Sequence, residues 1–296
     1  MTTLSEEFSD EIGVWLLDLR ENERMEADPQ ALPPVATIED ANAVLNATCK
    51  VTSTLGEHVG WKCGACTESA WTKLGLTEPF RAPLHRLRIF QQSSSQTPVA
   101  IPSVLQQGML AIEAEFAFIM SKSLPPQTTP YTDAELWDAV EAVVPALEVC
   151  GTRWTGPAWE QATGFQKITD FGLNQNVVLG SDGTMGSYCQ THTLNDVRIQ
   201  ILVNGTQIAT GSGCNVLGHP IKALGWLASD LNRCQLSTRT HMYGGGQDIG
   251  LVKGDVVMSG ATVVVPANAF QPGDVVTAVF EGMGEVSLVL AVKSKM

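Results

Sequence analysis

The hydrophobic pattern at the start of the chain predicts an amphipathic helix. Within residues 8–24, Ile12, Trp15, Leu16 and Leu19 recur at the three- and four-residue spacing of a single helical face. A face of this kind needs a partner to cover it, so we expect this helix to pack against another element.

A second helix is predicted over residues 38–55, beyond a proline-rich break. Thr37 and Asp40 have the spacing of a capping box, with Asp in place of the usual Glu, and Gly56 marks the expected end. The two helices together predict an N-terminal helical lobe or arm.

From Gly60 onward, short β-rich segments alternate with turns. Two further helices are expected, over residues 132–146, where Thr132 and Glu135 form a capping box, and over residues 217–234. Residues 237–250 are expected to form a surface loop. The fold class predicted from this pattern is α+β, with an antiparallel or mixed β-structure toward the C-terminus and strands within residues 106–120, 197–208, 255–265 and 274–292.

Composition places the chain among globular proteins. It has 296 residues, of which 44% are hydrophobic and 17% charged, enough for one large domain or two modest ones. No apolar run approaches the roughly 20 residues that cross a bilayer, and the acidic start lacks the pattern of a secretory or mitochondrial leader. We therefore expect a cytoplasmic protein, without a membrane partner, whose seven scattered cysteines are reduced thiols.

The net charge of −13 comes from 31 acidic against 18 basic side chains. Such a charge repels phosphate backbones, which argues against a nucleic-acid partner. It does not exclude a small anionic substrate, because a bound cation can invert the local field.

The most informative segment contains Glu113 and Glu115, separated by one residue in a predicted strand. Residues two apart in a strand project from the same face, so the two carboxylates are expected side by side. A third acid, Glu148, lies in an equally apolar segment. Three carboxylates with water suit a hard divalent cation such as Mg²⁺ or Mn²⁺. From the pattern alone, the alternative is that the pair lies on a solvated strand face, with Glu148 as a cap or salt-bridge partner.

Several separated blocks occur in an order and spacing that resemble one known family. The chain resembles the 2-keto-4-pentenoate hydratase and 4-oxalocrotonate decarboxylase branch of the fumarylacetoacetate hydrolase superfamily, from about residue 12 to residue 290. The blocks are Gly60-Trp61-Lys62-Cys63-Gly64, Glu113-Ala114-Glu115, Pro145-Ala146-Leu147-Glu148-Val149-Cys150-Gly151-Thr152-Arg153, Val216-Leu217-Gly218-His219-Pro220, Gly254-Asp255 and Pro272-Gly273-Asp274.

The resemblance implies that Glu113, Glu115 and Glu148 bind Mg²⁺ or Mn²⁺ and that Lys62 acts in proton transfer. Burial between Trp61 and Cys63 is expected to lower the pKa of Lys62 toward neutrality. The resemblance further implies a homo-oligomer. Its fold is expected to be a mixed β-sandwich or β-roll with peripheral helices. We expect a helical region over residues 1–80 and a β-rich catalytic region over residues 81–296, forming one continuous unit.

The expected activity is that of a metal-dependent lyase acting on a small 2-oxo or 2-hydroxydienoate acid. Hydration of 2-hydroxypenta-2,4-dienoate, or of a close analogue, is the first hypothesis. Decarboxylation or tautomerisation of a 2-oxo acid is the alternative, since all three reactions proceed through an enolate. A catalytically silent homologue that serves as a binding or scaffold protein is the third hypothesis.

Other positions separate the chain from the usual pattern of the branch. Asp170 is kept and is expected to hold a water or orient Lys62, or to act as a turn cap. Phe171 and Leu173 replace polar residues, which predicts a more apolar pocket and altered specificity.

Two arginines are expected to bind the substrate. Arg153 matches the family and is expected to pair with a substrate carboxylate or to form a structural salt bridge. Shortly after Pro79, where the family often has a Gly, Arg81 adds a cation. Cys63 and Cys66 form a CxxC that lacks the second half of a zinc site, so both are expected to be buried thiols.

Overall fold

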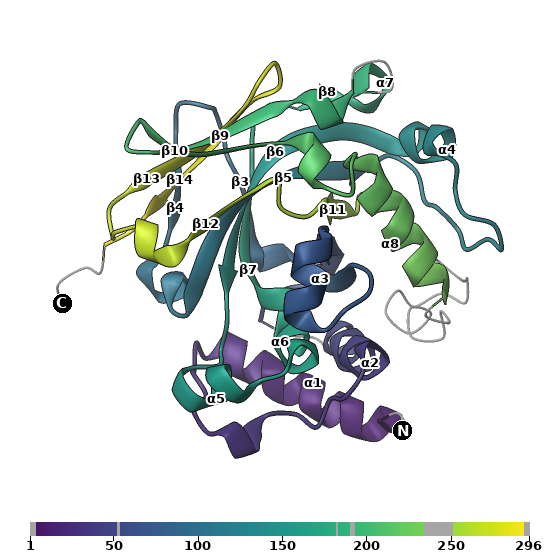
Figure 1. Cartoon of the computed structure of the whole chain (residues 1–296), viewed down its shortest axis with the longest axis vertical. Helices are drawn as coiled ribbons and strands as arrows, with labels where there is room; N and C mark the ends of the chain where they lie inside the picture. Colours follow the sequence, from purple (N-terminus) through teal and green to yellow (C-terminus); the bar gives the residue numbers. More distant parts are fainter. Residues whose placement is uncertain (1–3, 52–53, 182, 190–192, 234–250, 293–296) are drawn as a thin grey trace.

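The computed structural model describes residues 4–51, 54–181, 183–189, 193–233 and 251–292 of the chain (Figure 1). The loop predicted over residues 237–250 lies outside this part of the chain. The helices are α1 (Glu6–Glu21), α2 (Ile38–Lys50), α3 (Glu68–Leu74), α4 (Asp133–Asp138), α5 (Gly156–Gln161), α6 (Gly164–Thr169), α7 (Gly186–Cys189) and α8 (Ile221–Arg233).

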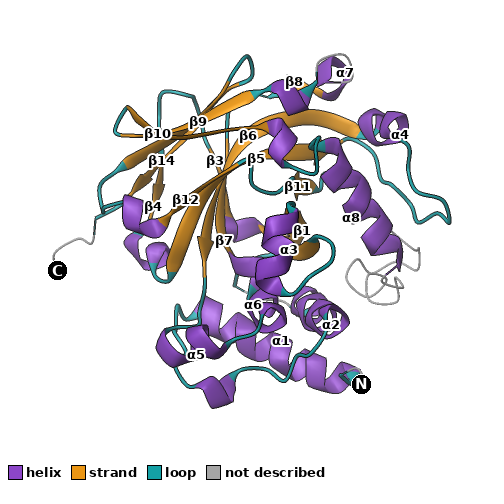
Figure 2. Ribbon diagram, in the orientation of Figure 1, coloured by secondary structure: helices purple, strands orange, loops and turns teal. Residues whose placement is uncertain are grey.

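Two curved β-sheets form the centre of the molecule, with the helices outside them (Figure 2). The larger sheet has the order β2-β1-β11-β5-β6-β7-β3, with β12 paired to β5 and β8 paired to β6. Its strands are β1 (His58–Gly64), β2 (Phe80–His85), β3 (Ile89–Gln91), β5 (Met109–Met120), β6 (Val140–Gly151), β7 (Asn174–Leu179), β8 (Thr184–Met185), β11 (Val256–Met258) and β12 (Val263–Pro266).

The smaller sheet has the order β10-β9-β13-β14-β4 and packs its apolar face on the larger one. Phe116 of β5 meets Phe280 across the interface, with ring centroids 5.2 Å apart in an edge-to-face arrangement. The strands of this sheet are β4 (Val99–Ile101), β9 (Arg198–Val203), β10 (Thr206–Ser212), β13 (Val275–Phe280) and β14 (Gly284–Leu290). The expected α+β fold with a β-sandwich core and peripheral helices is therefore confirmed.

Helices α1 and α2 lie together at one end of the molecule, beside α5 and α6 (Figure 1). The predicted apolar face of α1 is correct, because Ile12 and Leu16 are buried in a core shared with α2, Trp154 and Phe171. Thr37 caps α2 by accepting from the backbone N–H of Asp40. The carboxylate of Asp40 also accepts from the backbone N–H groups of Leu4 and Ala36.

The helix predicted over residues 132–146 is wrong in its second half. The capping box of Thr132 and Glu135 is present, but α4 ends at Asp138 and β6 begins at Val140. Val143 and Val144 are β-branched, and the neighbouring β5 offers a full length of strand to pair with, so tertiary pairing overrides the helical spacing. This correction places Glu148 in a strand.

Strand β1 belongs to the residues expected to form the N-terminal helical region, yet it pairs with β2 and with β11 in the main sheet. The boundary at residue 80 stays a prediction. Strand β1 lies before this boundary and β11 lies after it, so their pairing places both proposed regions in one sheet. Within the described part of the chain, no helix is both long and apolar enough to span a membrane.

Candidate active site

The long strands β5 and β6 bring two of the three predicted glutamates together. Glu113 of β5 is the direct cross-strand partner of Glu148 of β6, in an antiparallel register that runs from Ala111 to Ile119. Side chains of directly opposed residues have their Cβ atoms roughly 5 Å apart on the same face. Oxygens of both carboxylates and the sulfur of Cys150 lie within 4.8 Å of one another, an arrangement that could hold a metal ion.

Lys62 lies at the centre of this acidic group. Its Nζ lies 2.9 Å from each carboxylate oxygen of Glu148 and donates to the carbonyl oxygen of Gly172 at 3.1 Å. Lys62 is 4% exposed and Glu148 is fully buried, so this ion pair is removed from water. Lys62 belongs to β1, which β11 and β5 separate from β6 in the sheet, so only a curved sheet allows the contact.

Glu115, the third predicted glutamate, lies on the same strand face but has a different neighbour. Its Oε2 accepts from the backbone N–H of Gly260 at 2.8 Å, while its buried Oε1 has no hydrogen-bond partner within the described residues. Gly260 has a φ of +92°, and a Cβ there would lie 2.5 Å from the sulfur of Cys66, so this contact requires glycine.

Burial and mutual repulsion dominate the electrostatics of the cluster. Burial, followed by the negative charge of Glu148, raises the pKa of both Glu113 and Glu115. Burial lowers the pKa of Lys62, but the carboxylate of Glu148 and the other anions more than offset it, so the net shift is upward. The predicted lowering of the Lys62 pKa is therefore wrong for this arrangement, because the sequence did not reveal its counter-ion. One ammonium facing three carboxylates leaves the cluster short of positive charge.

A cavity of about 270 Å³ opens onto the cluster. Lys62, Glu113 and Cys150 form its polar end. The remaining wall is largely apolar and comes from several separate elements, including Leu74, Phe80, Leu110, Leu173 and Val264. We refer to this space as the site cavity.

An unusual backbone segment joins the cluster to the cavity wall. Phe171, Gly172 and Leu173 all have positive φ values, of 53°, 59° and 64°. For the two non-glycine residues this conformation is strained, and such strain concentrates at ligand sites. It presents the carbonyl of Gly172 to Lys62 and leaves Leu173 lining the site cavity, whereas Phe171 is buried against His85.

Two side chains of this cluster were missed by sequence reasoning. Asn174 Nδ2 donates to Glu148 Oε1 at 2.7 Å, the oxygen that Lys62 also contacts. Cys150 follows Glu148 by two residues in β6, so the strand periodicity could have indicated it. No local sequence pattern indicates the contact of Asn174 with Glu148, because this contact depends on the pairing of β6 with β7.

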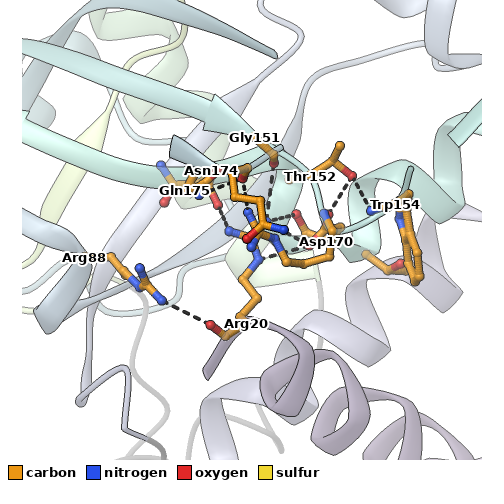
Figure 3. A network of polar contacts seen from close by, with 12 residues as sticks. Arg20, Arg88, Gly151, Thr152, Trp154, Asp170, Asn174 and Gln175 are labelled. Carbon is orange, nitrogen blue, oxygen red and sulfur yellow. Dashed lines mark hydrogen bonds and ion pairs between the residues drawn. The ribbon is translucent and has the colours of Figure 1, made fainter. Parts of the chain in front are cut away.

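Asp170 is fully buried and lies in a network of polar contacts next to the cluster (Figure 3). Its Oδ1 accepts from Arg20 Nε at 3.0 Å and Nη2 at 2.8 Å. Its Oδ2 accepts from Thr152 Oγ1 at 2.8 Å and from the backbone N–H of Arg153 at 2.6 Å. Arg20 also donates through Nη1 to the carbonyl of Asn174, so α1 is connected to the residue that contacts Glu148. Asp170 contacts these groups rather than Lys62, and its catalytic role stays a prediction.

The two arginines predicted to contact substrate are engaged elsewhere. Arg153 pairs with Glu23 at 2.9 Å. Arg81 pairs with Asp230 at 2.8 Å and lies over the ring of Trp61. Both guanidinium groups are almost fully buried, and neither residue lines the site cavity. Substrate binding by either arginine would require these contacts to break.

The CxxC segment consists of two free, buried thiols, as predicted. Cys63 Sγ donates to the carbonyl of Ala223 and Cys66 Sγ to that of Ser259, at 3.6 and 3.3 Å. Burial raises the pKa of both thiols, so they are protonated near neutral pH.

The curved two-sheet fold and its buried cluster of carboxylates and lysine at a cavity define the class of protein. Residues 71–290 match the family described as fumarylacetoacetate (FAA) hydrolase C-terminal, and the chain belongs to this family. It is 28% identical over 263 residues to the 2-keto-4-pentenoate hydratase of Paraburkholderia xenovorans (strain LB400), covering 86% of this chain and 84% of the relative.

Two further comparisons agree with this assignment. The 2-hydroxyhexa-2,4-dienoate hydratase of Comamonas testosteroni is 26% identical over 267 residues, covering 86% of this chain and 87% of the relative. Among solved structures, the 4-oxalocrotonate decarboxylase from Pseudomonas putida G7, complexed with magnesium and adipate, superposes with a TM-score of 0.78. That alignment covers 98% of this chain and 99% of the other at 21% identity, so it supports the fold.

Proposed function

We propose that the protein is a divalent-metal-dependent lyase that hydrates 2-hydroxypenta-2,4-dienoate or a close analogue. The observation that carries this proposal is the convergence of Lys62 and the carboxylates of Glu113 and Glu148 at one end of an apolar cavity. The named relatives support it, because both are hydratases of short 2-oxo or 2-hydroxydienoate acids.

The residues present fit a hard cation. The Oε1 of Glu115, which has no partner among the described residues, and the close approach of Glu113 to Glu148 are expected where a positive charge binds. Oxygen ligands suit Mg²⁺ or Mn²⁺. We propose Glu113, Glu115 and Glu148 as the ligands. Such an ion supplies Lewis-acid stabilisation for negative charge that develops on the 2-oxo acid.

In the proposed reaction, the side chains of the site move protons. Hydration consumes one water: its hydroxyl adds at C4, protons are added at C3 and C5, and the C2 hydroxyl loses its proton. Lys62 lines the cavity and carries its protons on a flexible stem, so we assign it proton delivery from Nζ. The Gly172 carbonyl holds Nζ in place through its hydrogen bond.

The activity is tested by supplying 2-hydroxypenta-2,4-dienoate to the Mg²⁺- or Mn²⁺-loaded protein. Loss of dienoate absorbance with formation of 4-hydroxy-2-oxopentanoate supports hydration. Release of CO₂ from 4-oxalocrotonate, without water addition to the dienoate, would identify a decarboxylase instead. A protein that binds no metal and turns over neither compound would be the silent homologue. Light scattering on the same sample tests the expected homo-oligomer.

Removal of the metal is expected to abolish turnover reversibly. After chelation and dialysis, activity should fall below about 1% of the loaded protein and return on addition of Mg²⁺ or Mn²⁺. Because the ion binds the folded state, saturating metal should also raise the unfolding temperature. Full activity of a protein shown by mass spectrometry to hold no metal would contradict the prediction.

Replacing Asn174 by alanine is expected to weaken metal binding about 10- to 100-fold, because outer partners orient the ligating groups. The change removes the hydrogen bond to Glu148 and leaves the glutamate itself in place. Asn176→Ala is the matched control, since this buried asparagine of the same strand donates to Leu105. Equal metal affinities of the two variants, measured by titration calorimetry, would exclude an orienting role for Asn174.

A further inference from the structure

We propose that the site cavity selects 2-oxo acids whose far end is an uncharged hydrocarbon group, and that Leu110 and Leu173 make this selection. The inference rests on the proposed function and goes further, because it excludes substrates with a second carboxylate. It is carried by the way in which the backbone places these two leucines.

A break in the pairing of β5 with β6 places Leu110 in the cavity wall. Met109 is opposite Gly151 and Ala111 is opposite Cys150, so Leu110 has no partner in the ladder. This is the geometry of a β-bulge, which redirects a side chain and often occurs beside active sites. Leu110 thereby lines the site cavity together with Ala111, its neighbour in the strand.

The left-handed segment at residues 171–173 places the second leucine. Leu173 has a φ of 64° and is partly exposed, in contrast to the buried residues on either side of it. Because it follows Gly172, whose carbonyl accepts from Lys62, Leu173 lies next to the polar end of the cavity. Helix α3 adds Ala70 and Leu74 to the wall, so the apolar surface comes from three separate parts of the chain.

The charged side chains that line the cavity all belong to the polar end. Among the described residues, Lys62 is the one cation of the lining and Glu113 the one acid. Arg81 and Arg153 cannot serve a distal carboxylate without breaking their pairs with Asp230 and Glu23. A dicarboxylic acid held through its 2-oxo acid end would therefore meet, among the described lining residues, no cation for its second carboxylate beyond the polar end.

This arrangement has a measurable consequence for binding. A charged group that loses water without gaining a partner weakens binding, whereas a methylene or methyl group against an apolar wall strengthens it. Between two ligands of equal length, the one that ends in a methyl group should bind about tenfold or more tightly than the one that ends in a carboxylate.

The test uses 2-oxohexanoate and 2-oxoadipate, which share a six-carbon chain and a 2-oxo acid end and differ at C6. Their affinities for the Mg²⁺-loaded protein are measured by titration calorimetry, so no turnover is needed. We expect 2-oxohexanoate to bind about tenfold or more tightly. Equal or tighter binding of 2-oxoadipate would overturn the inference.

Variants of the cavity wall test whether its apolar character sets this preference. Leu110→Arg should shift the ratio of the two affinities by about tenfold or more toward 2-oxoadipate, because it adds a cation at the bulge. Leu110→Met, which keeps an apolar side chain of similar size, should leave the ratio unchanged. Leu74→Arg, at the partly exposed end of α3, provides a second charge should Leu110→Arg fail to fold. An unchanged ratio in every folded arginine variant would refute selection by this wall.

The outcomes separate this inference from the proposed function. Hydration of the dienoate with no preference between the two probes would leave the function intact and remove the inference. Failure of the Mg²⁺-loaded protein both to bind either probe and to hydrate the dienoate would remove both.

Discussion

Replacing Lys62 by methionine should reduce turnover of the metal-loaded protein by about 10³-fold, within the range that a positioned proton-transfer group contributes. Methionine keeps the length of the stem and removes the ammonium that contacts Glu148 and Gly172. The measurement is kcat for the dienoate together with metal content.

Metal binding distinguishes a catalytic Lys62 from a structural one. Because the ammonium contacts both oxygens of Glu148, its removal should leave affinity for Mg²⁺ unchanged or higher, even as turnover falls. Without metal, the same variant should unfold more easily, since Glu148 is then buried without its counter-ion. Lys222→Met, at an exposed lysine paired with Asp133, should change neither quantity. Wild-type turnover in the Lys62 variant would disprove the assignment.

The second large effect is expected at Arg20, whose guanidinium joins α1 to the residues beneath the site (Figure 3). Arg20→Met should lower the free energy of unfolding by about 3–5 kcal/mol, because it leaves Asp170 as a buried carboxylate with an incomplete set of partners. Denaturant titration measures the change.

Arg24→Met is the matched control for Arg20. Arg24 lies just beyond α1 and pairs with Asp18, and both side chains are about half exposed. Pairs of this kind contribute at most about 1 kcal/mol, so the variant should be close to the wild type. Similar losses at the two positions would show that the buried network does not stabilise the fold.

Local sequence patterns correctly predicted helix faces and helix starts that depend only on residues within the helix itself or next to it. The face of α1, the cap of α2 at Thr37 and the capping box at Thr132 are all signals contained within one turn of helix. The same patterns failed after Asp138, where helical spacing continues into β6. There the outcome depends on strand β5, some twenty residues earlier in the chain, which no local pattern describes.

The site shows the same division between local and distant information. That Glu113 and Glu115 share a face follows from the period of a strand, and the strand is present. The position of Glu148 opposite Glu113 follows from register, which the sequence does not state. The contacts of Asp170 and Arg81 depend on partners about 150 residues away, Arg20 and Asp230, so their involvement in structural ion pairs could not be foreseen.

The register between β5 and β6 also limits how this site can diverge. A slip of one strand by one residue would place the two glutamates on opposite faces of the sheet, and a slip by two would separate them along the strands. The hydrogen bonds between β5 and β6 thus determine the spacing of the two carboxylates. This spacing can change only when the register shifts by a whole residue. The bulge at Leu110 and the turn before Asn174 lie outside this constraint, so new substrates can be accommodated there while the acidic pair keeps its geometry.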